Sequence, residues 1–152
     1  MNATFWFRIT AIVMFLFAVL HTIGFLSFRP PSAEGMAVWS GMNGVSFAIN
    51  GGTYSYGHFY RAFGLAITAA QLFGVWVAWT LGSMARRGDG GVRAIAWGII
   101  AWQIVGIAIA AIYVSAKPAS MSAATVICIA IALVRLPRSS ESKDDSLNSS
   151  ES

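Results

Sequence analysis

The chain is poor in the residue types on which most familiar chemistries depend. It has a single cysteine, Cys128, so it can form neither an intrachain disulfide nor a dithiol relay. Its six acidic residues all lie outside the long apolar stretches, which argues against a carboxylate proton relay or a carboxylate-rich metal site. The glycines of 88–91 lack the lysine of a phosphate-binding loop. We therefore expect no metal and no cofactor.

Charge is also scarce, and its distribution predicts the fold. Only 11% of the residues are charged, against about 25% in an average soluble protein. A membrane-spanning helix needs about 20 apolar residues and pairs all of its own backbone groups. We predict an all-α membrane protein, a bundle of four transmembrane helices within a domain of residues 1–138, followed by a disordered polar tail at 139–152. The predicted spans are the apolar blocks 9–28, 62–82, 94–115 and 120–136, whose one charged residue, Arg135, lies at the end of the last block.

The basic residues predict the orientation of the bundle. Cytoplasmic loops carry the excess of Lys and Arg, and the segment between the second and third spans is rich in Arg. We expect both termini in the cytoplasm of a bacterium, with the chain in its inner (plasma) membrane. Three basic residues then lie outside, namely Arg29, Arg61 and Lys117. Seven lie inside, namely Arg8, Arg86, Arg87, Arg93, Arg135, Arg138 and Lys143.

The expected partners follow from the same pattern. The net charge of +4 comes from this loop bias, and no basic run with interleaved aromatic residues is present, so we expect no nucleic-acid partner. The lipid bilayer is the first expected partner. A lipid-like small molecule, a second copy of the chain or a larger membrane complex are further candidates.

The first outer loop, 29–57, is the longest connection. Pro30 and Pro31 stop the first span, and Ser32 is a suitable N-cap for a new helix. Apolar residues then recur at spacings of three and four, so we predict a helix over 33–49 that ends at the Asn-Gly-Gly of 50–52. This helix either lies on the membrane surface or covers the bundle, and the pattern is compatible with both.

The segment 54–64 gathers three tyrosines, a histidine and an arginine at the entrance to the second span. Positions 58 and 61 lie near each other on a helix, and that face can point toward His21 in the first span. The alternative is that the Tyr and Arg side chains only anchor the helix at the membrane interface. If the face of positions 58 and 61 points toward His21, the segment predicts a ligand-binding pocket. Its candidate residues are His21, His58, Tyr60, Arg61, Tyr113 and Lys117.

Two further polar features lie inside the predicted spans. His21 is an ionisable group within the membrane, which makes it a functional candidate, although a neutral imidazole bonded to another helix is an equal alternative. A haem between His21 and His58 is disfavoured because the two lie at different depths. Gln71 and Gln103 lie at the middle of neighbouring antiparallel spans, so we predict a structural amide hydrogen bond between them.

Two short motifs resemble a known group of proteins. Leu-His-Thr-Ile-Gly at 20–24 and Gly-His-Phe-Tyr-Arg-Ala-Phe-Gly at 57–64 are similar to motifs of a family of small uncharacterised bacterial integral membrane proteins with four helices. That family carries Leu-His-Thr-x-Gly in its first helix and Phe-Tyr-x-x-Phe-Gly at the entrance to its second. The resemblance implies the four-helix fold and supplies no activity.

Three functions remain open on the sequence. The first is an accessory or lipid-interacting membrane protein without catalysis. The second is a membrane-embedded enzyme, similar to an acid–base isomerase, in which His21 or His58 moves a proton of a lipid-like substrate while Tyr60 and Arg61 hold its head group. The third is a subunit of an oligomeric small transporter, since four helices alone enclose little space.

Overall fold

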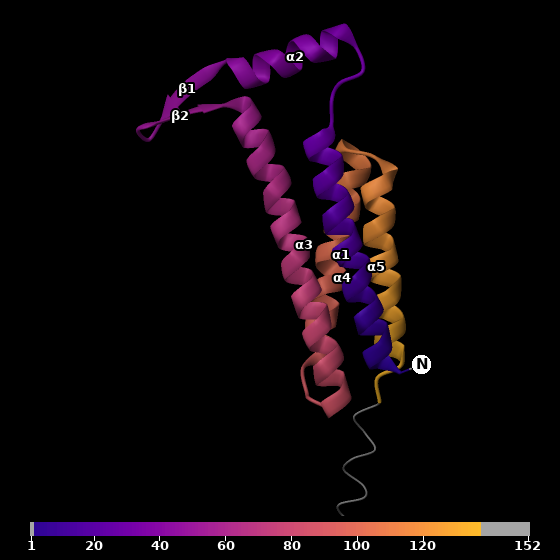
Figure 1. Cartoon of the computed structure of the whole chain (residues 1–152). Coiled ribbons are helices and arrows are strands. Elements are labelled where there is room, and N and C mark those ends of the chain that lie inside the picture. The colour runs from indigo at the N-terminus through magenta and orange to yellow at the C-terminus, as the bar shows by residue number, and fades with distance from the viewer. Residues whose placement is uncertain (1, 138–152) are drawn as a thin grey trace, which may run out of the picture.

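The computed structural model describes residues 2–137, and within them four long helices run side by side (Figure 1). These are α1 (Ala3–Ser27), α3 (Tyr56–Arg87), α4 (Val92–Tyr113) and α5 (Ala116–Val134). Each is long and apolar enough to cross a membrane, and together they contain most of the four predicted blocks. The protein is an integral membrane protein with four spans. The predicted tail at 139–152 lies outside the described residues.

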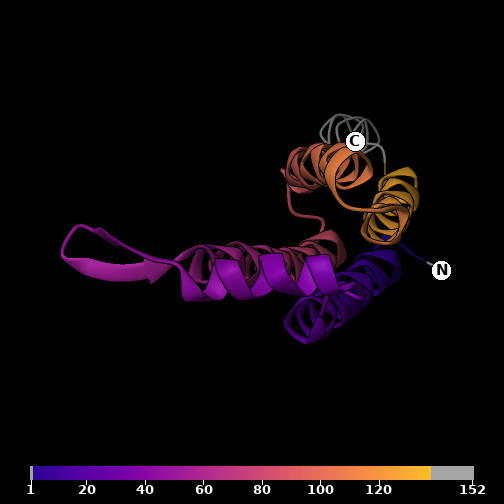
Figure 2. The same cartoon turned by 90° about the horizontal axis from the view of Figure 1, so that it is seen from above.

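The four spans do not pack equally against one another. Helix α1 packs against both α3 and α5, and α4 packs mainly against α5. Figure 2 shows the resulting order around the bundle, α3, α1, α5 and α4. Contacts between α3 and α4 are sparse, because α3 leans away from the other spans toward one end of the bundle (Figure 1). That end is the one at which α1 stops and α3 starts.

The tightly packed part of the bundle lies toward the opposite end. Phe7, Met14, Leu81 and Ile129 are completely or almost completely buried there. Between Val19 and Ser27, in contrast, no residue of α1 is buried. The many exposed apolar side chains, such as Phe63 on α3, face outward as expected of surfaces in contact with lipid.

The connection between the first two spans differs from its prediction. Helix α2 (Ala33–Gly44) starts at Ser32, whose hydroxyl accepts a hydrogen bond from the backbone of Gly35 at 3.0 Å. It ends at Gly44, five residues before the predicted end, and an antiparallel hairpin of β1 (Ser46–Ile49) and β2 (Gly52–Ser55) follows. The prediction of a single helix over 33–49 was wrong for its last five residues, 45–49.

The sequence Asn50-Gly51 explains this hairpin. Both residues have positive φ, 50° and 81°, which a two-residue hairpin turn requires and which Asn and Gly adopt most readily. Helix α2 lies across one end of the spans, and the hairpin extends beyond α3, away from the bundle (Figures 1 and 2). No residue within Ala33–Gly44 is buried. The crosswise helix therefore borders the end of the bundle without being enclosed by it.

Candidate functional site

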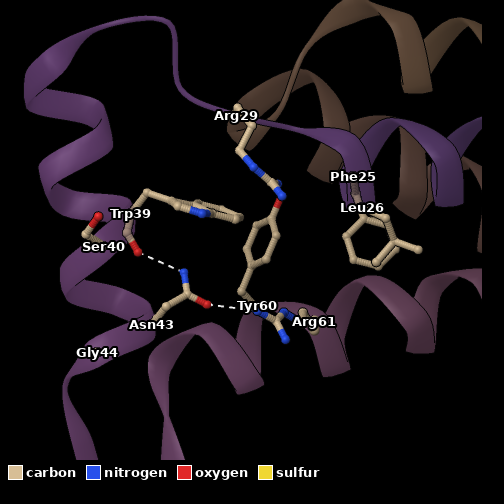
Figure 3. Close-up of a pocket in the computed structure, with 9 residues that line it drawn as sticks. All are labelled: Phe25, Leu26, Arg29, Trp39, Ser40, Asn43, Gly44, Tyr60 and Arg61. Carbon is tan, nitrogen blue, oxygen red and sulfur yellow. Dashed lines mark hydrogen bonds between the residues drawn. The ribbon is translucent and has the colours of Figure 1, made fainter.

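A pocket lies where α2 crosses the ends of α1 and α3. Its volume is about 680 Å³, and Figure 3 shows its walls. Two arginines, two small polar residues and three aromatic rings dominate the lining. The lining residues are Phe25, Leu26, Arg29, Trp39, Ser40, Asn43, Gly44, Tyr60 and Arg61. No Asp or Glu among residues 2–137 lines the pocket, so its charge is positive.

A chain of hydrogen bonds fixes Arg61 to α2. The Arg61 guanidinium donates to Asn43 Oδ1 at 3.0 Å, and Asn43 Nδ2 donates to the Trp39 carbonyl at 2.8 Å (Figure 3). A guanidinium has five N–H groups, and this bond uses one of them. Arg61 is therefore oriented by α2 while most of its donors stay free for a ligand.

Arg29 reaches the pocket from the end of α1. Its guanidinium donates to the Phe28 carbonyl at 2.7 Å and lies 5.6 Å from the centroid of the Trp39 ring, within the range of a cation–π contact. Trp39 in turn meets the Tyr60 ring edge to face, with centroids 5.4 Å apart. The indole thus connects Arg29, two residues beyond α1, with Tyr60 on α3.

Two glycines of α3 permit these close approaches. A Cβ at Gly64 would lie 2.5 Å from Cε2 of Phe25, and a Cβ at Gly57 would collide with the Asn43 amide. The two glycines are seven positions apart, which places them on one face of α3 two turns from each other. The first and last residues of the 57–64 motif therefore have a steric role: Gly57 lets α2 pack closely on α3, and Gly64 lets α1 do so.

His21 lies beneath the pocket, separated from it by Phe25. The imidazole Nε2 is 3.2 Å from the carbonyl oxygen of Gly64, and the ring stacks on Phe25 at a centroid distance of 5.4 Å. Phe25 also contacts Tyr60 at 6.1 Å. The structure thus brings His21 close to the pocket that Tyr60 and Arg61 line, but His21 is not among the lining residues of the described chain.

His58 faces elsewhere because its side chain completes the capping box of α3, whose N-cap is Ser55. The Ser55 backbone N–H donates to His58 Nδ1 at 3.2 Å, and the His58 N–H donates to Ser55 Oγ at 3.3 Å, a reciprocal capping box. The His58 ring borders a second, more open cavity of about 430 Å³, beside Tyr54 and Phe59. Sequence spacing suggests that His58 and His21 converge, and the structure does not bring them together.

Tyr113 and Lys117 do not line the pocket of the described chain either. They flank the connection of α4 to α5 at the same end of the bundle, and Tyr113 is 80% exposed. The lean of α3 away from α4 accounts for the separation (Figure 1). Gln71 and Gln103, by comparison, lie together, with Gln103 Nε2 donating to Gln71 Oε1 at 3.4 Å in a buried position.

Seven of the lining residues were not predicted as site residues from the sequence, namely Phe25, Leu26, Arg29, Trp39, Ser40, Asn43 and Gly44. One signal for them was present, because Trp39 and Asn43 are four positions apart and so share a face of α2. The direction in which α2 folds back over the bundle depends on contacts across the fold and leaves no local pattern. Within residues 2–137 no group of three or more His, Cys, Asp or Glu is placed to hold a metal ion.

Comparison with known proteins adds no closer description. No protein-family model, no curated protein and no solved structure matches the chain. The chain is a small polytopic membrane protein. The resemblance of its motifs at 20–24 and 57–64 to a four-helix family therefore rests on those short segments alone. In the structure the two segments are in contact, through His21 and Gly64.

Proposed function

We propose that this protein is a lipid-interacting membrane protein that holds the head group of an amphiphilic molecule between α1, α2 and α3. The pocket carries this proposal, because it combines the guanidinium groups of Arg29 and Arg61 with the apolar side chains of Phe25 and Leu26. It does so at the end of membrane-spanning helices, where a lipid places its head group above its acyl chains. Tyr60 and Arg61 hold the head group in this proposal.

The orientation of the bundle is part of the same proposal. Positive charge favours the cytoplasmic side, which places both termini in the cytoplasm and the pocket at the outer face of a bacterial plasma membrane. The crosswise direction of α2 supports an interfacial position for it (Figure 1). The amphiphile then comes from the outer leaflet.

Binding is favoured over acid–base catalysis by the contacts of the two histidines. A general base must lie within hydrogen-bond reach of the proton that it removes. His21 Nε2 contacts the Gly64 carbonyl and His58 Nδ1 accepts from Ser55, and neither ring lines the pocket of the described chain. A ligand in the pocket meets arginine, amide and aromatic groups instead.

Photolabelling in proteoliposomes tests this function. A phospholipid with a diazirine near its head group is expected to label residues 39–44 and 60–61 more strongly than 113–117, which lie at the same end of the bundle. The variant Trp39→Ala should lose this preference, whereas Trp97→Ala, which removes an exposed indole from α4, should keep it. Equal labelling of all these segments would show only the surrounding bilayer and would contradict the proposal.

A further inference from the structure

We infer, on the basis of the proposed lipid-binding function, that the pocket selects a phospholipid whose head group carries a net negative charge over a zwitterionic one. The inference rests on two arginines that line one cavity, Arg29 in the connection after α1 and Arg61 on α3. It concerns the chemical class of the ligand, and can fail while lipid binding itself stands.

Within residues 2–137, no acidic side chain lines the pocket to offset the charge of the two arginines. Within residues 2–137 the only acidic residues are Glu34 and Asp89. Asp89 forms an ion pair with Arg87 at 2.6 Å, at the opposite end of the bundle. Glu34 lies in the first turn of α2 and is not among the lining residues. The ammonium group of a zwitterionic lipid would therefore meet two guanidinium groups and no carboxylate.

The arginine geometry suits a phosphate. Planar guanidinium groups present parallel N–H donors that match two phosphate oxygens, and such charge-assisted hydrogen bonds are about twice as strong as neutral ones. Asn43 holds Arg61 through one N–H and leaves four others for a ligand, counted over the contacts of the described chain. Arg29 is similarly supported by Trp39, at 5.6 Å. Both donors are oriented before the ligand arrives.

The apolar side of the pocket indicates a lipid as the source of the phosphate. Phe25 and Leu26, near the end of the membrane-spanning helix α1, supply apolar lining to the pocket. Burial of acyl carbon against such a lining is favourable, whereas a free phosphate ion gains nothing from it. A phospholipid can place its phosphate against the two arginines and its acyl chains against Phe25 and Leu26.

The experiment compares two lipids with identical acyl chains. Full-length protein is released from nanodiscs that contain equal amounts of phosphatidylglycerol and phosphatidylcholine, and the lipids that remain bound are counted by native mass spectrometry. Wild type should retain phosphatidylglycerol preferentially. Each of Arg29→Gln and Arg61→Gln should reduce that preference about fivefold, and the double variant about 25-fold, the attraction expected of one or two basic residues near anionic lipid.

Two control variants separate the pocket from general charge and from misfolding. Lys117→Gln removes one positive charge from the same end of the bundle, outside the pocket lining, and should leave the preference unchanged. The double variant Arg29→Lys, Arg61→Lys keeps the charge and removes the planar donors, so it should retain an intermediate preference. Circular dichroism of every variant confirms that its helices are intact.

Each remaining outcome has a defined meaning. Equal retention of the two lipids by wild type would overturn the charge selection and leave the lipid-binding function standing. Loss of all lipid from wild type would overturn both. A third measurement titrates inorganic phosphate into delipidated protein; phosphate binding that the double Gln variant abolishes, without any lipid retention, would overturn the lipid as ligand in favour of a water-soluble phosphate.

Discussion

His21 Nε2 lies 3.2 Å from the carbonyl oxygen of Gly64, and this contact joins the two most unusual segments of the chain. Beside it, Thr22 Oγ1 and Thr68 Oγ1 are 2.8 Å apart, with Thr68 four residues after Gly64 on α3. Both contacts lie in the part of the bundle where α1 has no buried residue beyond Ala18 among its described positions. These polar contacts act beside the close approach of the Phe25 ring to Gly64 in holding α1 against α3 beneath the pocket.

Replacement of the imidazole tests this role. His21→Ala removes the bond to Gly64 and the stacking on Phe25, so we expect a loss of about 1 kcal/mol in the free energy of unfolding, the usual size of an interhelical polar contact in membranes. Unfolding by SDS, followed by circular dichroism, measures it. Leu20→Ala, at a neighbouring position that is 59% exposed, is the control and should change little. If both variants are as stable as wild type, the contact between His21 and Gly64 does not contribute to the free energy of unfolding.

The close packing of Phe25 against α3 can be tested by adding one methyl group at Gly64. In Gly64→Ala the new Cβ would lie 2.5 Å from the Phe25 ring, so we expect destabilisation by about 1–3 kcal/mol through overpacking. Gly24→Ala makes the same change in α1 with no atom within 4 Å, and should be neutral or slightly stabilising because Ala favours a helix. The same unfolding assay compares them. Equal effects of the two variants would contradict the steric role of Gly64.

The membrane fold could be predicted from the sequence because its cause is local. Long uncharged blocks must become helices in a bilayer, whatever their neighbours, and the four observed spans contain most of the predicted residues. Span ends were less predictable, since α3 continues to Arg87 and starts already at Tyr56, through residues with few apolar side chains. The hairpin at Asn50-Gly51 had a recognisable signal that the helical spacing before it obscured.

The pocket was only partly predictable because its walls come from three separate segments. Tyr60 and Arg61 stood out by composition, and both line it. Arg29 and Trp39 join them only because α2 folds back over the ends of α1 and α3. His58 was expected on the same side, but the capping box with Ser55 turns its ring toward another cavity. The direction of such a side chain depends on its hydrogen bonds, which cannot be predicted from residue spacing.

The buried amide pair is suited to a double-mutant cycle. Gln103→Leu alone leaves the Gln71 amide without its buried partner, and Gln71→Leu does the same to Gln103. We expect each single variant to lose stability and the double variant to lose less than their sum, with a coupling free energy of about 0.6–2 kcal/mol. SDS unfolding of the four proteins gives the value. Strict additivity would show that the bond contributes nothing.

The cap of α3 should affect stability without affecting the ligand. His58→Ala removes the acceptor for the Ser55 N–H, so we expect a cost of about 0.5–2 kcal/mol, as for other lost helix caps. Because His58 does not line the arginine pocket of the described chain, the lipid preference should remain that of wild type. Ser55→Ala is the matched variant for the other half of the cap. A lost lipid preference in His58→Ala would give this ring a ligand role that its position does not suggest.

The position of α2 over the pocket can be changed without substituting any lining residue. In Gly57→Ala the new methyl group would collide with the Asn43 amide and lie 3.3 Å from the Met42 carbonyl, which pushes α2 away from α3 and removes the support of Arg61. Gly57 is buried, but no residue of Ala33–Gly44 is, so α2 can shift without opening the core. We therefore expect a loss of overall stability of about 1 kcal/mol, the average cost of a point substitution.

Lipid retention should respond far more strongly than stability in this variant. We expect the preference for phosphatidylglycerol to fall about as far as in Arg61→Gln, roughly fivefold, because Arg61 loses its orientation in both. Gly41→Ala, in α2 itself with no atom within 4 Å of the added Cβ, should retain the full preference. If Gly57→Ala binds lipid like wild type, the seating of α2 on α3 does not shape the site, and Arg61 acts as a flexible surface charge.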